Sequence, residues 1–298
     1  MASTFMPARD DATATHSFAR TDASITAMRS ILLHVNNDAG MEARLQAALD
    51  LARAFDGHIT CLQPISFDFA VPGDLYGTMI AELLPAMQEA ADAVRDRMRA
   101  RLGAEDVAWD WKQAEGPSRP LLIEAEALAD LVVVGARDPA SNGTGPSELA
   151  GYLAVHGRSP LLVVPETTRA LDLAGPAVIG WNGSLEGAHA LRAAVPLLRR
   201  ASSVTLANVA EAAEESNPSL PCIDAAEYLS RHGIVSEIVE IGRGEETVAG
   251  ALANAAAACG AVYLVIGAYG HTRALETVFG GVTRELFSDP PLPLFTAH

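Results

Sequence analysis

Four glycines near the end of the chain frame a stretch that could hold an anion. The stretch reads GAYGHTRALETVFGGVT and covers residues 267–283. Because glycine weakens regular structure, this spacing indicates a backbone that another group approaches closely. Amides in a loop without side chains, and unpaired amides at the start of a helix, both bind phosphate. We therefore expect an anion site here. Its contributors would be Gly267, Gly270, Gly280, Gly281, Val282 and Thr283.

A strand and a helix must position that site. The apolar run Tyr263–Gly267 predicts a strand that ends at the first glycine, and residues 283–288 predict the helix that follows the last one. Another apolar run ends at Asn182. Because ligands of doubly wound folds bind beyond the carboxyl ends of parallel strands, we expect Asn182 and Gly267 at the same edge of a sheet.

The two halves of the chain repeat one pattern. An apolar strand that ends in asparagine and small polar residues occurs at Arg29–Asp38 and again at Pro176–Ser184, so that Asn36 corresponds to Asn182. The helical patterns that follow also correspond, as do three later strands: 42–55 with 186–200, 58–63 with 203–209, 131–135 with 263–267, and 159–165 with 292–296.

Continuous apolar strands alternate with amphipathic helices in each half. Such strands are buried on both faces, which is typical of a parallel sheet covered by helices. The expected fold class is therefore α/β, with two tandem doubly wound domains, each a five-stranded parallel sheet with helices on both faces. We expect a disordered tail over 1–25, domains over 26–166 and 176–298, and a linker over 166–175.

Composition excludes several classes of partner. The chain has 298 residues and a net charge of -16, which would repel both duplex DNA and an anionic membrane. No apolar run is long enough to span a bilayer, and residues 1–24 lack the apolar centre of a secretory signal, so we expect a cytoplasmic protein. The three cysteines form no metal or disulfide pattern. Cys61 and Cys259 lie in apolar surroundings and are expected to be buried thiols.

The second half resembles the universal stress protein family. Nucleotide-binding members of that family carry Gly-x-x-Gly, nine residues, and then Gly followed by Ser or Thr. Here Gly267, Gly270 and Gly280 match, and Gly281 stands where the hydroxyl residue is expected. The resemblance covers residues 176–298 and includes the Asn-Gly-Ser sequence after the first strand. The first half resembles the same family more weakly, so the whole chain is similar to a tandem member.

This resemblance implies a site for an adenine nucleotide, ATP or AMP, with no metal evident. Asn182 stands where the family usually has Asp, and it would contact the adenosine. By the same resemblance, Gly180 and Val209 would border the adenine, Ile266 and Gly267 the nucleoside, and Gly270, Gly280, Gly281, Val282 and Thr283 the phosphates. Glycine at 281 removes one hydrogen bond to phosphate, which is worth on the order of 1.5–3 kcal/mol.

The first half lacks these features. Asp138 replaces the second glycine, and Ser147-Glu148 stand where the later glycine pair would be. Because two carboxylates would repel a phosphate, we expect a degenerate site in a domain that serves as a pseudo-symmetric partner. In this family the closing strands of two domains can pair across a two-fold axis. Here they could pair within one chain, and two chains could form a homodimer.

The same residues have plainer structural explanations. The glycines could serve tight turns and close helix–strand packing, and Asn182 with Ser184 could form a turn and a helix cap. Trp181 is expected to pack in the core. Trp109-Asp-Trp111 predicts an edge strand, and residues 79–101 predict a long helix that is kinked at Pro85 or begins there.

Binding rather than catalysis is expected. The sequence offers no phosphate-loop lysine, no carboxylate cluster for magnesium and no Ser/His/Asp or Cys/His arrangement. An ATP-using enzyme of a related α/β superfamily would need a basic phosphate-binding signature at residues 182–186, which read Asn-Gly-Ser-Leu-Glu. The expected function is an adenine-nucleotide-binding regulatory protein of the stress response. The alternative is a nucleotide-free interaction or dimerisation module of the same fold.

Overall fold

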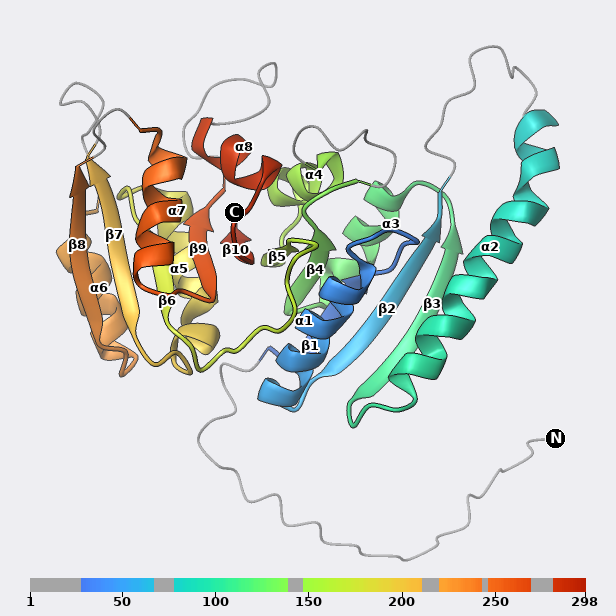
Figure 1. Ribbon diagram of the computed structural model, residues 1–298, viewed down its shortest axis with the longest axis horizontal. Coiled ribbons are helices and arrows are strands. Elements are labelled where there is room, and N and C mark those ends of the chain that lie inside the picture. Colours follow the sequence, from blue (N-terminus) through green and yellow to red (C-terminus); the bar gives the residue numbers. More distant parts are fainter. Residues whose placement is uncertain (1–27, 67–77, 139–146, 211–219, 243–245, 269–280) are drawn as a thin grey trace, which may run out of the picture.

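A single sheet runs through the protein (Figure 1). The computed structural model describes residues 28–66, 78–138, 147–210, 220–242, 246–268 and 281–298. Within these ranges the sheet has ten strands in the order β3-β2-β1-β4-β5-β10-β9-β6-β7-β8. The first five are β1 Ser30–His34, β2 His58–Ile65, β3 Ala108–Glu115, β4 Leu131–Gly135 and β5 Leu161–Val164. The others are β6 Ala177–Gly180, β7 Val204–Ala210, β8 Ser236–Gly242, β9 Tyr263–Gly267 and β10 Leu294–Ala297.

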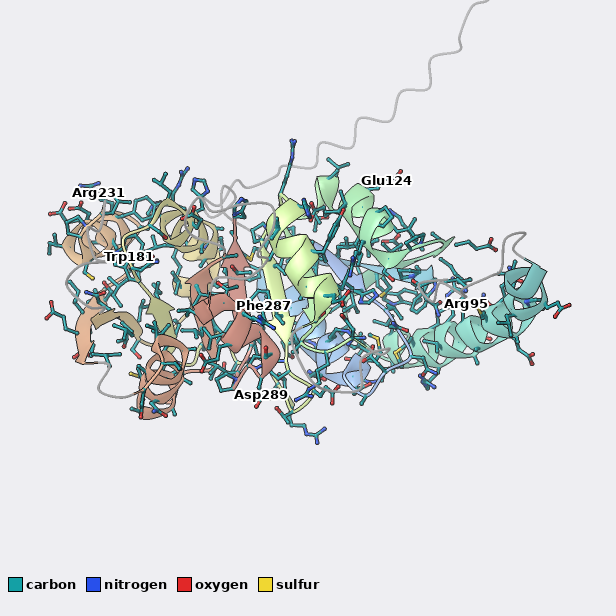
Figure 2. All side chains as sticks on the ribbon, turned by 90° about the horizontal axis from the view of Figure 1, so that it is seen from above. Arg95, Glu124, Trp181, Arg231, Phe287 and Asp289 are labelled. Carbon is teal, nitrogen blue, oxygen red and sulfur yellow. The ribbon has the colours of Figure 1, made fainter. Side chains whose placement is uncertain are left out.

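Helices cover both faces of the sheet, as Figure 2 shows from above. The first half contributes α1 Met41–Phe55, α2 Thr78–Leu102, α3 Ser118–Ala125 and α4 Glu148–His156. The second contributes α5 Leu185–Leu198, α6 Cys222–Arg231, α7 Val248–Ala258 and α8 Gly281–Ser288. One buried cluster joins α1, α2, α5 and α6 to one face, and a second joins α3, α4, α7 and α8 to the other. Each half is therefore a parallel α/β layer structure, as the sequence predicts.

The strand register supports the internal repeat. Ile31 of β1 pairs with Leu131 of β4, and Ala177 of β6 pairs with Tyr263 of β9. Counting forward from these pairs brings His34 into correspondence with Gly180, and Asn36 with Asn182. The repeat inferred from sequence therefore has the same alignment as the two halves of the sheet.

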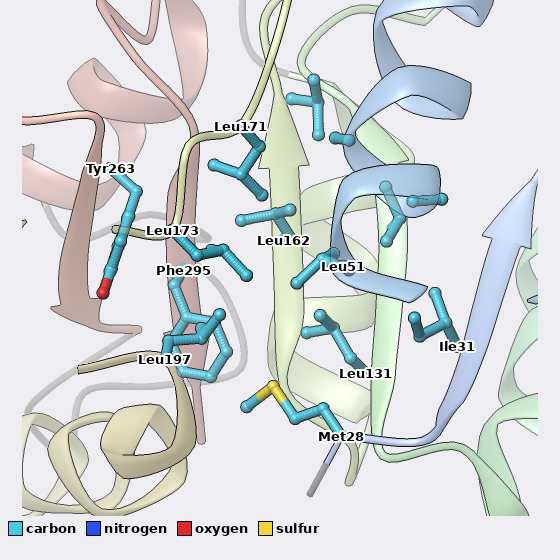
Figure 3. Close-up of a cluster of buried hydrophobic side chains, with 14 of the residues drawn as sticks. Met28, Ile31, Leu51, Leu131, Leu162, Leu171, Leu173, Leu197, Tyr263 and Phe295 are labelled. Carbon is cyan, nitrogen blue, oxygen red and sulfur yellow. The ribbon is translucent and has the colours of Figure 1, made fainter. Parts of the chain in front are cut away.

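The two halves join through their closing strands. β5 and β10 pair antiparallel, with Leu162 opposite Phe295 and Leu161 opposite Thr296, whereas every other strand pair is parallel. The expected pairing within one chain is therefore present. Phe295 is fully buried and lies beside Leu162, Leu173 and Leu197 in the same cluster (Figure 3).

The segment between β5 and β6 contributes to that junction. It forms no helix or strand, yet Leu171 and Leu173 are buried in the cluster of Figure 3. The amide of Leu171 also donates to the Asp50 carboxylate, 2.9 Å away on α1. Residues 166–175 are thus a packed part of the core rather than a spacer between two independent bodies.

Several local expectations differ from the structure. α2 begins at Thr78 and continues through Pro85, so the proline does not start the helix. α8 begins at Gly281, two residues before the predicted start. Cys61 is buried but Cys259 is exposed, so the expectation for Cys259 was wrong. It follows α7 directly, on the solvent side of that helix's end.

Other local expectations are confirmed. β3, which contains Trp109 and Trp111, is an edge strand of the sheet. Trp181 is buried in the core. No helix within the described part of the chain is long and apolar enough to cross a membrane.

Replacing Phe295 by Ala should destabilise both halves together. The change leaves a cavity at the junction and should lower the free energy of unfolding by about 3–5 kcal/mol. Guanidinium unfolding followed by circular dichroism would measure it. The control is Leu128→Ala, which truncates a side chain that is 89% exposed and should change stability by less than about 0.5 kcal/mol. Equal effects of the two substitutions would contradict the role given to the junction.

Candidate functional site

Four helices of the second half begin at the carboxyl edge of its strands. α5 follows β6, α6 follows β7, α7 follows β8 and α8 follows β9, so their first turns lie at that edge. Two of these starts are capped by side chains. Ser184 Oγ accepts from the amide of Gly187, and Thr247 Oγ1 accepts from the amide of Gly250, each at 3.0 Å. These caps satisfy amides that a helix start otherwise leaves unpaired.

Gly267 allows the end of β9 to touch the start of α5. A Cβ atom on Gly267 would lie 2.5 Å from the backbone nitrogen of Gly187 and 2.7 Å from the carbonyl carbon of Glu186. No side chain fits at such distances, because both neighbours are backbone atoms. The packing explanation therefore accounts for this glycine without a ligand.

Gly180 lies against Ile266, and Val209 belongs to the same apolar cluster as Ile266. Val209 and Ile266 are buried in one cluster with Leu252 of α7. A Cβ atom on Gly180 would lie 3.0 Å from Leu252 and 3.2 Å from Ile266. These residues form an apolar wall at the carboxyl ends of β6, β7 and β9. The wall is of the kind that borders an adenine ring, and its members also pack against one another.

Asn182 makes a local turn and keeps a donor exposed. Its Oδ1 accepts from the amide of Ser184 at 3.1 Å, so the turn explanation is correct for the oxygen. The side chain is exposed, and its nitrogen has no hydrogen-bond partner among the described residues. The neighbouring Trp181 is buried, and its indole nitrogen donates to the Leu220 carbonyl at 3.1 Å. Asn182 therefore faces solvent, and its side-chain nitrogen has no described partner. Trp181 has a structural role.

The start of α8 differs from those of α5 and α7. No described residue outside α8 accepts a hydrogen bond from the amides of Gly281, Val282 or Thr283. Gly281 is exposed, and a Cβ atom there would meet nothing within 4 Å. The far side of the helix is anchored, because Phe287, labelled in Figure 2, is fully buried. The helix is thus held in place, and the part of the chain that the structure describes supplies no partner for the first amides at the positive end of its dipole.

The remaining predicted residues lie outside the described part of the chain. These are Gly270 and Gly280. The loop contribution to the anion site accordingly stays a prediction. Close to α8, Glu285 accepts a hydrogen bond from Thr247 at 2.7 Å, which ties the starts of α7 and α8 together.

In the first half a carboxylate occupies the corresponding helix start. Asp138 accepts from the Ser147 hydroxyl and from the amide of Glu148, each at 2.5 Å, and lies 3.4 Å from the amide of Leu149. Glu148 pairs instead with Arg119 on the surface. The sequence predicted that two carboxylates would repel a phosphate at this helix start. In the structure Asp138 instead occupies the start by binding its amides.

A buried ion pair lies at the carboxyl ends of β1 and β4. Arg44 of α1 is 1% exposed and forms two hydrogen bonds with the Asp38 carboxylate, at 2.8 and 2.7 Å. A Cβ atom on Gly135, at the end of β4, would lie 2.6 Å from the Arg44 guanidinium. The sequence patterns did not predict this pair. Its only signal was Arg44, one of two arginines in the helix over 42–55.

His34 lies at the end of β1 and is fully buried. Its Nε2 has no hydrogen-bond partner, and desolvation together with the charge of Arg44 lowers the pKa of the ring from 6.5 to about 3. The imidazole is therefore neutral over the physiological range. It occupies the position that corresponds to Gly180 in the second half.

Two other features carry no candidate site. A hollow of about 330 Å³ lies where β2 and β3 meet α2. Its polar side chains already pair with one another, Arg95 with Asp92 and Gln88 with Glu115. Within the described ranges, no group of three or more His, Cys, Asp or Glu side chains could hold a metal ion.

Replacing Gly267 by Ala should be destabilising, whereas Gly281→Ala should be tolerated. The first puts a methyl group against backbone atoms of α5 and should lower stability by about 1–3 kcal/mol, and the second enters open space. Thermal melts of the two variants would compare them. Similar melting temperatures would show that α5 moves away at no cost.

Acid should destabilise the protein partly through His34. The unfolded chain binds this proton near pH 6.5, whereas the folded chain binds it only near pH 3. Stability therefore falls as the pH decreases through that window, by up to about 1.4 kcal/mol per pH unit. His34→Leu should flatten this loss. Urea unfolding at pH 7, 5 and 4 measures it, and parallel pH profiles for the variant and the original would contradict the assignment.

The comparisons concern family and fold. The model of the universal stress protein family matches residues 28–165, the half in which the motifs had indicated the weaker resemblance. No curated protein matches the chain.

A universal stress protein from Archaeoglobus fulgidus DSM 4304 is similar in structure, with a TM-score of 0.71 and 15% identity over 90% of this chain and 97% of that one. A functionally unknown protein from Pseudomonas aeruginosa PAO1 gives a TM-score of 0.56 and 15% identity over 91% and 92%. At this identity the two structures share the fold alone. Residues 28–165 therefore match the universal stress protein family, and the second half of the chain repeats the same fold.

Proposed function

We propose that the second half binds an adenine nucleotide and that the protein is a regulatory protein of the stress response. The observation that supports this most is the open start of α8, where the amides of Gly281, Val282 and Thr283 lack partners outside the helix among the described residues. Such amides, with the helix dipole behind them, favour a phosphate group. The absent Cβ at Gly281 lets the phosphate approach the backbone.

The neighbouring residues suit the rest of a nucleotide. Gly180, Val209 and Ile266 offer an apolar wall for the adenine at the carboxyl ends of their strands. The exposed nitrogen of Asn182 can donate to the ribose or the base, while its oxygen keeps the turn in place. Gly267 would act indirectly by holding α5 close to β9. The ligand would be ATP or AMP, bound in the cytoplasm without catalysis.

A nucleotide-free interaction module is the second candidate. The packing of Gly267 and Gly180 favours it, because both glycines have structural reasons for being there. The turn made by Asn182 favours it as well. In that case the two joined halves, rather than a bound ligand, would present the surface that partners recognise.

Thermal shift with ATP, ADP and AMP at millimolar concentration separates these two functions. A ligand present at a hundred times its Kd should stabilise the protein by about 2.7 kcal/mol, because it binds the folded state alone. Guanosine triphosphate serves as the control for base selectivity. Absence of stabilisation by all three adenine nucleotides would favour the interaction module.

Substitutions at Gly281 locate the site. Gly281→Ser adds a hydroxyl in open space and should tighten binding about tenfold or more, in line with a hydrogen bond to a charged group. Gly281→Asp places a carboxylate at the same helix start, which should abolish binding while leaving the melting temperature unchanged or higher. Calorimetric titration measures both. Equal affinities for the two variants would place the nucleotide elsewhere.

A further inference from the structure

The start of α4 is filled by the chain's own groups. The Asp138 carboxylate accepts from the Ser147 hydroxyl and from the first amides of α4, and Ser147 Oγ accepts from the amide of Ala150 at 3.0 Å. The first turn of α4 therefore has an anion and a hydroxyl in place without any ligand. At a helix start without such groups, a phosphate can bind the same amides.

α4 and α8 occupy corresponding places. Each follows the fourth strand of its half, β4 or β9, and each precedes the closing strand, β5 or β10. In sequence, Asp138 is three residues after Gly135, as Gly270 is three residues after Gly267. In the half whose sequence retains Gly270, no described residue outside α8 accepts from the amides of the helix start, whereas in the half that carries Asp138 the carboxylate accepts from them.

In the first half, the region that corresponds to the adenine wall of the second half is also filled. His34 is buried at the position that corresponds to Gly180, so an imidazole stands where the second half has no side chain. At the end of the fourth strand both halves have glycine: the Arg44 guanidinium, paired with Asp38, lies against Gly135, whereas the atoms nearest to Gly267 are backbone atoms of α5. The first half therefore has a side chain at the position of Gly180, and a charged side chain rather than backbone beside its Gly135.

We propose that the first half is held permanently closed by its own substitutes for a nucleotide. Asp138 stands in for the phosphate, and the buried His34 fills the position that corresponds to Gly180 at the adenine wall. The chain therefore takes up one nucleotide rather than two, and the first half acts as a fixed scaffold whose shape does not respond to ligand. The count of one rests on the proposed function of the second half.

Calorimetric titration of the full chain with ATP and AMP tests the count. One nucleotide per chain, lost in Gly281→Asp, agrees with the proposal. Two per chain, or one that persists in Gly281→Asp, overturns it while leaving nucleotide binding intact. Absence of any uptake by the wild-type chain counts against the proposed function instead, and the next experiment then decides the part played by Asp138.

That experiment compares Asp138→Gly with Asp138→Asn. Glycine vacates the start of α4, whereas asparagine keeps an acceptor of the same shape there. Asp138→Gly should lower the melting temperature by roughly 2–4 °C, and inorganic phosphate should restore at least half of that loss relative to sodium chloride of equal ionic strength. Asp138→Asn and the wild-type chain should show no such response. If phosphate acts alike on both variants, or on neither, Asp138 is not an internal anion and the proposal fails.

Discussion

The antiparallel pairing of β5 with β10 is the contact on which the rest of the structure depends. It turns two five-stranded layers into one sheet, and it brings the apolar faces of both halves into two continuous clusters. Leu171 and Leu173 complete it from the connecting segment, so the covalent link is itself part of the core. Neither half buries its closing strand without the other, which makes the folding of each half depend on its neighbour.

The two halves differ in how the first amides of their helices are paired. Every helix that starts at the carboxyl edge of a parallel sheet needs acceptors for its first amides. α4, α5 and α7 receive them from side chains of the chain itself, whereas α1, α3 and α6 have no side-chain cap. α8 receives none from outside the helix within the described ranges. The difference between the two halves at these helix starts thus comes down to a few polar side chains, while the backbone plan is common to both.

Much of the fold could be predicted from the sequence, because continuous apolar strands and the internal repeat leave few arrangements open. The α/β class and the edge position of Trp109 and Trp111 follow from such patterns, while the pairing of the closing strands was expected from the family resemblance. The candidate site was less predictable. Spacing alone cannot tell a glycine that admits a ligand from one that admits a helix, and Gly267 is of the second kind. Nor does the sequence reveal that Asp138 reaches the start of α4, or that Arg44 pairs inward with Asp38, because both contacts depend on how loops fold back onto the sheet.

The covalent joining of the halves also changes what mutation can do. In an assembly of two identical subunits, every substitution appears in both copies, so a plug such as Asp138 would close both sites at once. A duplicated chain escapes that constraint, since each copy of the pattern can drift by itself while the shared sheet holds them together. The same joining uses up both closing strands, so that a second molecule has to attach by some other surface of the protein.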